Sequence, residues 1–228
     1  MRFLPIGLTL ALVAAGCGGG GQKRVTATTP HVAARVYFLR DGKVAPVART
    51  LPALDPSDLT QALLDGPTSA ERAIGLTTAI PKGTAPIPIR GNPLGLAQYA
   101  YTLTQADPTG SVRIGSKSYT RADFEDFTPA ILVESPLPFT HVTSPLHMTG
   151  TANTYEATFQ YELEDASGKV VAKHFVTATS GNGIRGTFDV TIPFTVSAAT
   201  GGTLTVFEND AATGKRVHES VVPLTLGP

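Results

Sequence analysis

The sequence contains a single cysteine, Cys17, and no tryptophan among its 228 residues. One thiol can form neither an internal disulfide nor the several thiolate bonds of a structural zinc site. Charge is sparse and balanced: Lys and Arg together number 18, and so do Asp and Glu, which gives a formal net charge of zero. Because such a chain has no net field that attracts nucleic acid, we expect no nucleic-acid partner.

The start of the chain has the pattern of an export signal. Residues 3–15 form an apolar run that follows a basic start and is too short for a permanent membrane span. Small residues fill positions 14–16, directly before Cys17. This arrangement resembles the signal of a bacterial lipoprotein, which implies that a signal peptide of residues 1–16 is removed and that the Cys17 thiol is lipidated and takes up palmitate. An ordinary secretory signal with a chance cysteine is the alternative.

The composition of residues 17–32 predicts a flexible, lipidated tether. Four consecutive glycines occupy positions 18–21, and a polar, Thr-rich stretch follows them. Glycine runs order poorly, and acyl chains on the thiol would hold the membrane durably. After this tether the sequence has no further run of about 18 apolar residues. We therefore expect a protein that is anchored by lipid to the cell membrane and faces its extracytoplasmic side.

Residues 33–129 have the pattern of a small α+β domain. Two strands, 34–39 and 44–49, flank Asp41-Gly42, a pair that tolerates the positive φ of a tight hairpin. Helix starts are marked by a capping residue followed by proline, or by a capping box. These signals predict helices that begin near Pro56, Ser69 and Pro93, and a small hairpin over residues 111–119.

Four segments of this half carry a resemblance to a known family. They are VYFL at 36–39, ALLDGPTSAE at 62–71, IPKGT at 80–84 and LAQYAYTLTQ at 96–105. Together they resemble the GerMN domain of sporulation and spore-germination proteins. Members of that family carry one or two central strands where this chain has only residues 85–91. The resemblance implies a shortened GerMN-like domain over 33–129, in which either the sheet is narrower or the Pro-rich stretch replaces those strands.

Residues 130–228 have the pattern of strands alone. Phe159, Tyr161 and Leu163 alternate with polar residues, as in a strand with one buried face. About seven such strands over roughly 100 residues favour an immunoglobulin-like β-sandwich. The cysteine pair and tryptophan common in such folds are absent, so we expect a core of Phe, Tyr, Val and Leu side chains.

This second half also carries a resemblance. The segments are SPLHMTGTAN at 144–153, DASGK at 165–169, GTF at 186–188 and VFEND at 206–210. They are similar to the immunoglobulin-like domain of bacterial spore germination, which frequently follows GerMN on one chain. The two resemblances imply a non-catalytic interaction or assembly module in cell-envelope or sporulation and germination processes. They also imply an envelope protein partner.

The histidines give little support for catalysis or metal binding. No Gly-x-Ser-x-Gly, P-loop, Gly-x-Gly-x-x-Gly or His-Glu-x-x-His motif occurs. His141 and His147 have no carboxylate at ligand spacing, and His174 alternates with apolar residues, so we expect it near an apolar face. We therefore expect no catalytic residue, no cofactor and no metal site.

The strongest enzymatic alternative rests on two carboxylates. Glu162 and Glu164 lie two residues apart on a strand and hence about 6.6 Å apart on one face. Inverting glycosidases separate their carboxyl groups by roughly 6.5–9.5 Å, so a peptidoglycan hydrolase or its activator is conceivable. The alternation that pairs these glutamates also turns both toward solvent. Acidic residues at 123–126, 165–168 and 209–214 are interpreted as a polar linker and as turns rather than calcium sites.

Two segments are candidate contact surfaces, residues 85–93 and residues 179–186, although each has the composition of a plain connector. A third function, as a receptor for a solute or signal ligand, requires a deep pocket between the two domains.

Overall fold

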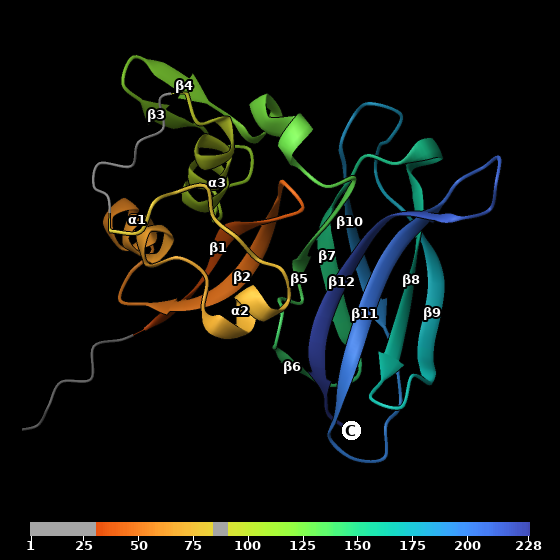
Figure 1. Ribbon diagram of the computed structural model, residues 1–228. Coiled ribbons are helices and arrows are strands. Elements are labelled where there is room, and N and C mark those ends of the chain that lie inside the picture. Colours follow the sequence, from red (N-terminus) through yellow and green to blue (C-terminus); the bar gives the residue numbers. More distant parts are fainter. Residues whose placement is uncertain (1–30, 84–90) are drawn as a thin grey trace, which may run out of the picture. The chain divides into compact units, whose positions relative to one another are not determined.

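A computed structural model describes residues 31–83 and 91–228 (Figure 1). The predicted signal peptide, Cys17 and nearly all of the tether lie outside the described residues, as does most of the Pro-rich segment 85–93. Residues 31–228 pack as one compact unit. Among the described helices, none combines the length and the apolar character that a membrane span needs.

The N-terminal half is built on a β-hairpin with helices packed against it (Figure 1). Asp41 and Gly42 form its turn, both with positive φ (51° and 72°), as the Asp-Gly pair predicts. The elements of this half are β1 (Val32–Arg40), β2 (Lys43–Leu51), α1 (Pro56–Asp65), α2 (Ser69–Ala73), α3 (Pro93–Leu103), β3 (Val112–Ile114), β4 (Lys117–Tyr119) and the 3₁₀ segment η1 (Arg121–Phe127).

The helix starts agree with the capping signals in the sequence. The Asp55 side chain accepts hydrogen bonds from the backbone N–H groups of two residues in the first turn of α1. Thr68 and Glu71 form a reciprocal capping box at α2, and Asn92 caps α3 by accepting from Gly95. These predictions are confirmed. They could be made from the sequence because each cap depends on residues within one helical turn.

The described part of the sheet in this half has two strands, β1 and β2. The outer edge of β1 is covered by polar side chains of α3 and the residues just after it. Thr102 Oγ1 accepts from Tyr37 N at 3.0 Å, Gln105 Oε1 accepts from Arg35 N at 2.9 Å, and Gln98 Nε2 donates to Tyr37 O at 3.1 Å. Buried backbone groups must be paired, and here side chains replace a neighbouring strand. The Pro-rich stretch that is the other alternative lies mostly outside the described residues, so both alternatives stay predictions.

The C-terminal half is a sandwich of two sheets (Figure 1). One sheet has the order β10-β7-β5 and the other β6-β12-β11-β8-β9. The elements are β5 (Ile131–Ser135), β6 (His141–Val142), β7 (Leu146–Ala152), η2 (Tyr155–Ala157), β8 (Thr158–Asp165), β9 (Val170–Thr177), β10 (Gly186–Ile192), β11 (Thr200–Asn209) and β12 (Arg216–Leu226). The sandwich prediction is confirmed with one strand added, β6, which is too short to show an alternating pattern.

The sandwich core consists of Phe, Tyr, Val and Leu side chains, as predicted, together with Ile, Ala and Met148. The rings of Phe159 and Phe188 meet edge to face with centroids 4.9 Å apart. Gly150 on β7 lies so close to its neighbours that a Cβ there would stand 2.0 Å from the Leu132 carbonyl oxygen. The sandwich therefore depends on the absence of a side chain at this position.

Candidate functional site

A buried charged network joins the two halves. Glu134 on β5 of the C-terminal half is 7% exposed, and its Oε1 accepts from Arg121 Nη1 at 2.7 Å and from the Tyr37 hydroxyl. Arg121 also donates to Thr104 Oγ1 at 3.0 Å and to the Tyr101 carbonyl at 3.2 Å. A charge this far from water is tolerated only with such partners, so the network fixes β5 against β1 and η1.

The network holds its groups in fixed ionisation states. Burial alone would raise the pKa of Glu134, but the Arg121 charge and the hydrogen bonds from Tyr37 and Arg121 together hold that pKa below its ordinary value. Burial, reinforced by the neighbouring Glu134, raises the pKa of Tyr37 far above its ordinary value. Glu134 is therefore a carboxylate and Tyr37 a neutral donor near neutral pH.

A second ion pair joins the two halves near η1. Arg185 donates from Nε and Nη2 to the two carboxylate oxygens of Glu125 at 2.8 and 2.9 Å, and Asn153 adds a bond at 2.9 Å. The interpretation of residues 123–126 as a polar linker is wrong for Glu125. Residues 179–186 are likewise more than a connector, because they carry Arg185. The two partners are 60 residues apart, so no local pattern could pair them.

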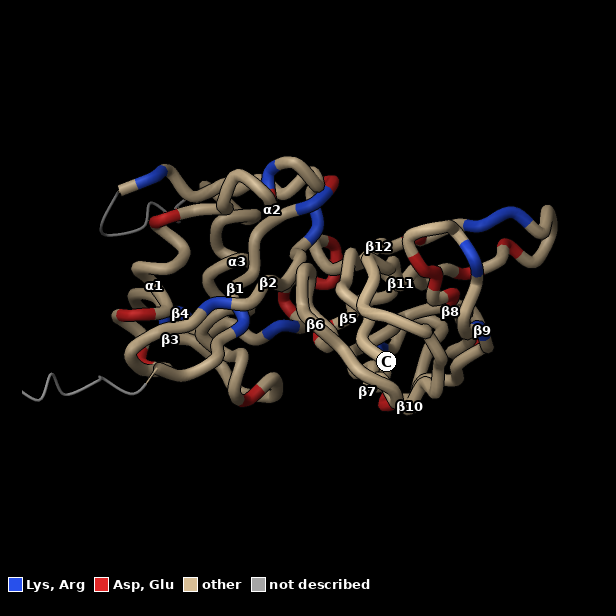
Figure 2. Tube along the Cα trace, turned by 90° about the horizontal axis from the view of Figure 1, so that it is seen from below, with Lys and Arg blue, Asp and Glu red and all other residues tan. Residues whose placement is uncertain are grey.

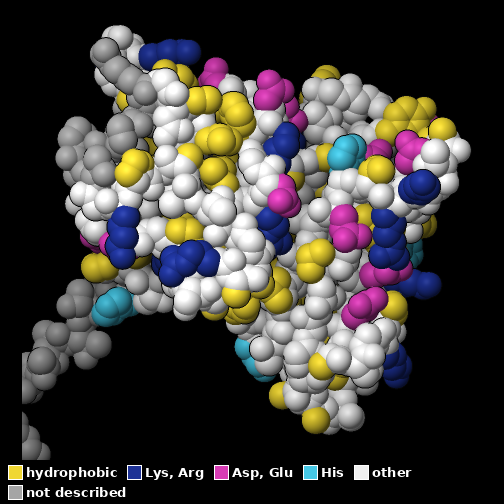
Figure 3. Space-filling view, in the orientation of Figure 1, with side chains coloured by type: hydrophobic (Ala, Val, Ile, Leu, Met, Phe, Trp, Pro, Cys, Tyr) yellow, Lys and Arg dark blue, Asp and Glu magenta, His cyan; other side chains and the backbone are white. Residues whose placement is uncertain are grey.

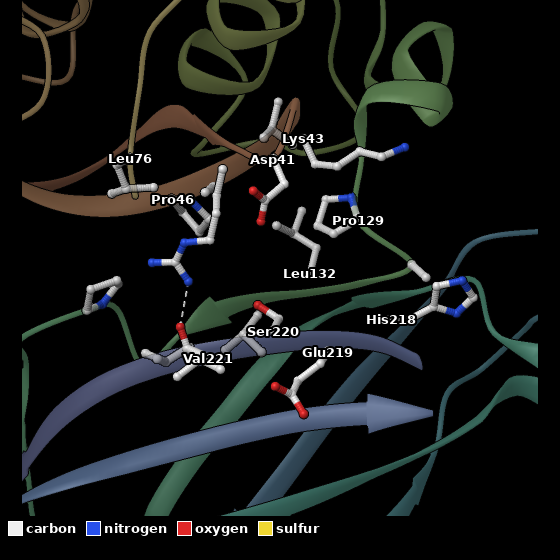
Figure 4. Close-up of a pocket in the computed structure, with 17 residues that line it drawn as sticks. Asp41, Lys43, Pro46, Leu76, Pro129, Leu132, His218, Glu219, Ser220 and Val221 are labelled. Atoms are coloured by element: carbon white, nitrogen blue, oxygen red, sulfur yellow. Dashed lines mark hydrogen bonds between the residues drawn. The ribbon is translucent and has the colours of Figure 1, made fainter. Parts of the chain in front are cut away.

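A cavity of about 200 Å³ opens where the two halves meet (Figure 4). We call it the seam cavity. Its walls come from the β1–β2 hairpin on one side and from β12 and residues 129–133 on the other. Figure 2 shows that residues of both charge signs occur along the trace where β2 approaches β5, and the space-filling view shows charged side chains of both signs around the boundary between the halves (Figure 3).

Arg40 spans the seam cavity. Its Nη1 donates to the Val221 carbonyl at 2.7 Å, which is the dashed line in Figure 4. Its Nε is buried, and no acceptor in the described part of the chain lies within hydrogen-bond distance. Burial lowers the pKa of Arg40, yet a guanidinium stays protonated in proteins. The seam cavity therefore contains a cation whose buried Nε donor is still available.

The comparison with known families finds a match within the second half. Residues 130–215 match the immunoglobulin-like domain of bacterial spore germination, Gmad2. No curated protein matches the chain. Among solved structures, CopC from Methylosinus trichosporium OB3b is 16% identical over 43% of this chain and 94% of that chain, with a TM-score of 0.27, which is too low to support an inference.

The paired glutamates of the C-terminal half lie as the sequence predicts. Glu162 and Glu164 alternate along β8 with the buried Tyr161 and Leu163, on the face turned away from the core. Glu162 accepts from Arg216 Nη2 at 2.6 Å, and neither glutamate lines the seam cavity. The structure therefore brings no catalytic partner to this pair among the described residues.

The histidine predictions are wrong at two positions. His174 is exposed, because β9 is the edge of its sheet and the ring projects beyond the core to pack against Phe175 with centroids 4.6 Å apart. His147 has a carboxylate neighbour after all, since its Nε2 bonds Asp189 on the adjacent strand β10. Within residues 31–83 and 91–228, no group of three or more His, Cys, Asp or Glu side chains is placed to hold a metal ion.

The carboxylates of the two acidic turns in the C-terminal half accept hydrogen bonds from their own turns. Asp165 accepts from the backbone N–H of Ser167 at 2.9 Å, and Asp210 accepts from Thr213 at 2.7 Å. Both carboxylates are thereby engaged in turn geometry, as the sequence predicts.

Sequence reasoning missed the residues that join the halves. Arg121, Glu134 and Arg40 belong to no motif, and Tyr37 lies in the VYFL segment, which gives no signal of its partners. Their contacts span sequence separations of up to 181 residues, the distance from Arg40 to Val221. One signal was available, a lone Glu directly after the apolar run at 131–133, since a charge at such a place must find a partner.

Proposed function

We propose that this protein is a non-catalytic, extracytoplasmic interaction or assembly module of the cell envelope, anchored to the membrane by lipid on Cys17. The observation that carries this proposal is the match of residues 130–215 to the Gmad2 domain of bacterial spore germination. The resemblance of the N-terminal half to GerMN and of residues 1–17 to a lipoprotein signal support the same setting. Its role belongs to envelope or sporulation and germination processes, with an envelope protein as the partner.

The two ion pairs that join the halves support the proposal of a module that presents one fixed binding surface. Glu134 and Glu125 each bind an arginine from a different part of the chain, at 2.7 and 2.8 Å. An adaptor gains affinity when its binding elements are held in place beforehand, because less freedom is lost on binding.

Crosslinking from native membranes tests this proposal. The full chain, with Cys17 intact, is crosslinked in its own cells and purified under denaturing conditions. We expect one envelope protein at a constant ratio to the chain. The matched control is a chain in which residues 1–32 carry an unrelated domain. Recovery of the same proteins with that control would contradict the proposal, because the anchor alone would then explain them.

The hydrolase alternative has its own assay. The purified full chain in detergent is incubated with peptidoglycan, and released muropeptides are measured. We expect none. Release that is lost in Glu162→Gln or Glu164→Gln would show an enzyme instead of an adaptor.

A receptor for a small solute is the second candidate function. The seam cavity is the specific observation that favours it, because a pocket between the two halves is what such a receptor requires.

A further inference from the structure

The walls of the seam cavity are mainly apolar. A volume of about 200 Å³ exceeds the roughly 150 Å³ of an apolar cavity that accepts benzene. The size therefore suits a branched aliphatic or single-ring side chain. The apolar side chains that line it include Val44, Pro46, Leu76, Leu132, Val133 and Val222.

One end of the seam cavity offers a cationic fork. Arg40 uses Nη1 to hold the Val221 carbonyl, while its buried Nε has no acceptor in the described part of the chain. A guanidinium binds a carboxylate best through two parallel N–H bonds. The unused donor of Arg40 is thus suited to a carboxylate that enters the seam cavity.

Asp41, the next residue, supplies the opposite charge. It lies in the turn of the β1–β2 hairpin with a φ of 51°, and this backbone conformation fixes the position of its Cβ atom. Figure 4 shows its carboxylate directed into the seam cavity beside Leu132. Asp41 takes part in none of the six ion pairs found among the described residues. It can therefore receive an ammonium group.

The other charged side chains that line the seam cavity are either hydrogen-bonded to other groups or directed away from Asp41. Lys43 Nζ donates to the Asp126 carbonyl at 2.6 Å, and His218 Nδ1 bonds the Glu208 carboxylate at 2.9 Å. Figure 4 shows the Glu219 carboxylate directed away from Asp41. An anion alone would meet the unpaired Asp41, and a cation alone would meet Arg40. A molecule that carries both charges satisfies each of them.

We propose that the seam cavity binds a free α-amino acid with an apolar side chain, whose carboxylate lies on Arg40, whose ammonium group lies on Asp41 and whose side chain fills the apolar floor. This inference goes beyond the interaction-module proposal and does not rest on it.

Calorimetric titration of the purified full chain in detergent tests the proposal. The probes are leucine and phenylalanine, then N-acetyl-leucine, which lacks the cation, and leucinamide, which lacks the anion. We expect at least one free amino acid to bind, and both blocked leucine derivatives to bind about tenfold more weakly or not at all, since each loses a charged hydrogen bond.

Two variants locate the binding. Asp41→Asn removes the charge and keeps a residue suited to the positive φ of the turn, and Arg40→Gln removes the guanidinium. Each is expected to raise the Kd of the bound amino acid about tenfold, whereas the control Glu164→Gln, outside the seam cavity, leaves it unchanged. Thermal melting checks that each variant folds.

Three outcomes would overturn the proposal: no binding of either amino acid at millimolar concentration, equal binding of the blocked derivatives, or an unchanged Kd in Asp41→Asn. None of them bears on the crosslinking result, so the two proposals fail separately.

Discussion

Glu134 connects the halves at the scale of single residues. It ends the apolar run of β5 and is almost wholly buried, yet it carries a charge. Arg121 and Tyr37, 13 and 97 residues away, make that charge tolerable. Breaking such a buried pair is costly, because the partner that remains keeps its charge without compensation.

Glu134→Leu is therefore expected to lower the free energy of unfolding by about 3–5 kcal/mol, since it leaves Arg121 buried and unpaired. Urea denaturation monitored by circular dichroism measures the loss. The double variant Arg121→Met/Glu134→Leu removes both charges and should regain most of it. A loss below about 1 kcal/mol in the single variant would show that the network does not hold the halves.

Three carboxylates that form ion pairs with arginine contribute to the pH dependence of stability. For Glu71, Glu125 and Glu134, burial raises the pKa, but hydrogen bonds and the charges of arginine partners outweigh it and leave each pKa below its ordinary value. The unfolded chain thus binds protons more readily than the folded chain. Their stabilisation is complete above the ordinary glutamate pKa of about 4.3 and is lost as the pH falls through the lower folded values.

Urea midpoints measured from about pH 6 down to about pH 2.5 should therefore decline steadily below about pH 4. The decline should be shallower in the Arg121→Met/Glu134→Leu variant, which lacks one of the three groups. A midpoint that stays constant across this range would contradict the ionised state of these carboxylates in the folded protein.

At the scale of secondary-structure elements, the packing depends on close contacts between neighbouring strands. Gly150 lets β7 pass beneath Phe188 and against the backbone of β5, where a Cβ would stand 2.7 Å from the Phe188 ring and 2.0 Å from the Leu132 oxygen. A backbone atom cannot move aside as a flexible side chain can. Strands β5, β7 and β10, which are neighbours in one sheet, consequently leave no room for even a methyl group at this point.

Gly150→Ala is expected to lower the free energy of unfolding by about 1–3 kcal/mol or more, because the added methyl forces the strands apart. Gly201→Ala is the matched control, since Gly201 is also in a strand, and its nearest neighbour to an added Cβ is a side-chain atom at 3.7 Å. Equal midpoints for the two variants in urea would show that β7 is not packed this tightly.

Elements formed by neighbouring residues could be predicted from the sequence. The Asp41-Gly42 turn, the caps at Asp55, Thr68 and Asn92, and the alternation along β8 all follow from local chemistry. The polar face of α3 could not, because Gln98 and Thr102 are buried only where they meet β1. The candidate site could not be predicted from the sequence either, because its residues meet only in the folded chain: Arg40 and Val221 are 181 residues apart.

At the scale of the whole molecule, the two halves are one unit with a match to the Gmad2 domain at 130–215 and a cavity at their junction. The proposed role requires that this unit be held at the membrane surface. Lipid on Cys17 is the feature of the proposal that supplies the attachment, and each buried methylene of an acyl chain contributes about 0.8 kcal/mol to it.

Mass spectrometry of the mature protein from its native cells tests this claim most directly. We predict that the N-terminal peptide begins at Cys17 and carries diacylglyceryl and acyl groups. Replacement of that residue, Cys17→Ser, should abolish palmitate labelling and leave the chain outside the membrane fraction. An unmodified Cys17 in a freely diffusing protein, or palmitate labelling that persists in the variant, would contradict the account.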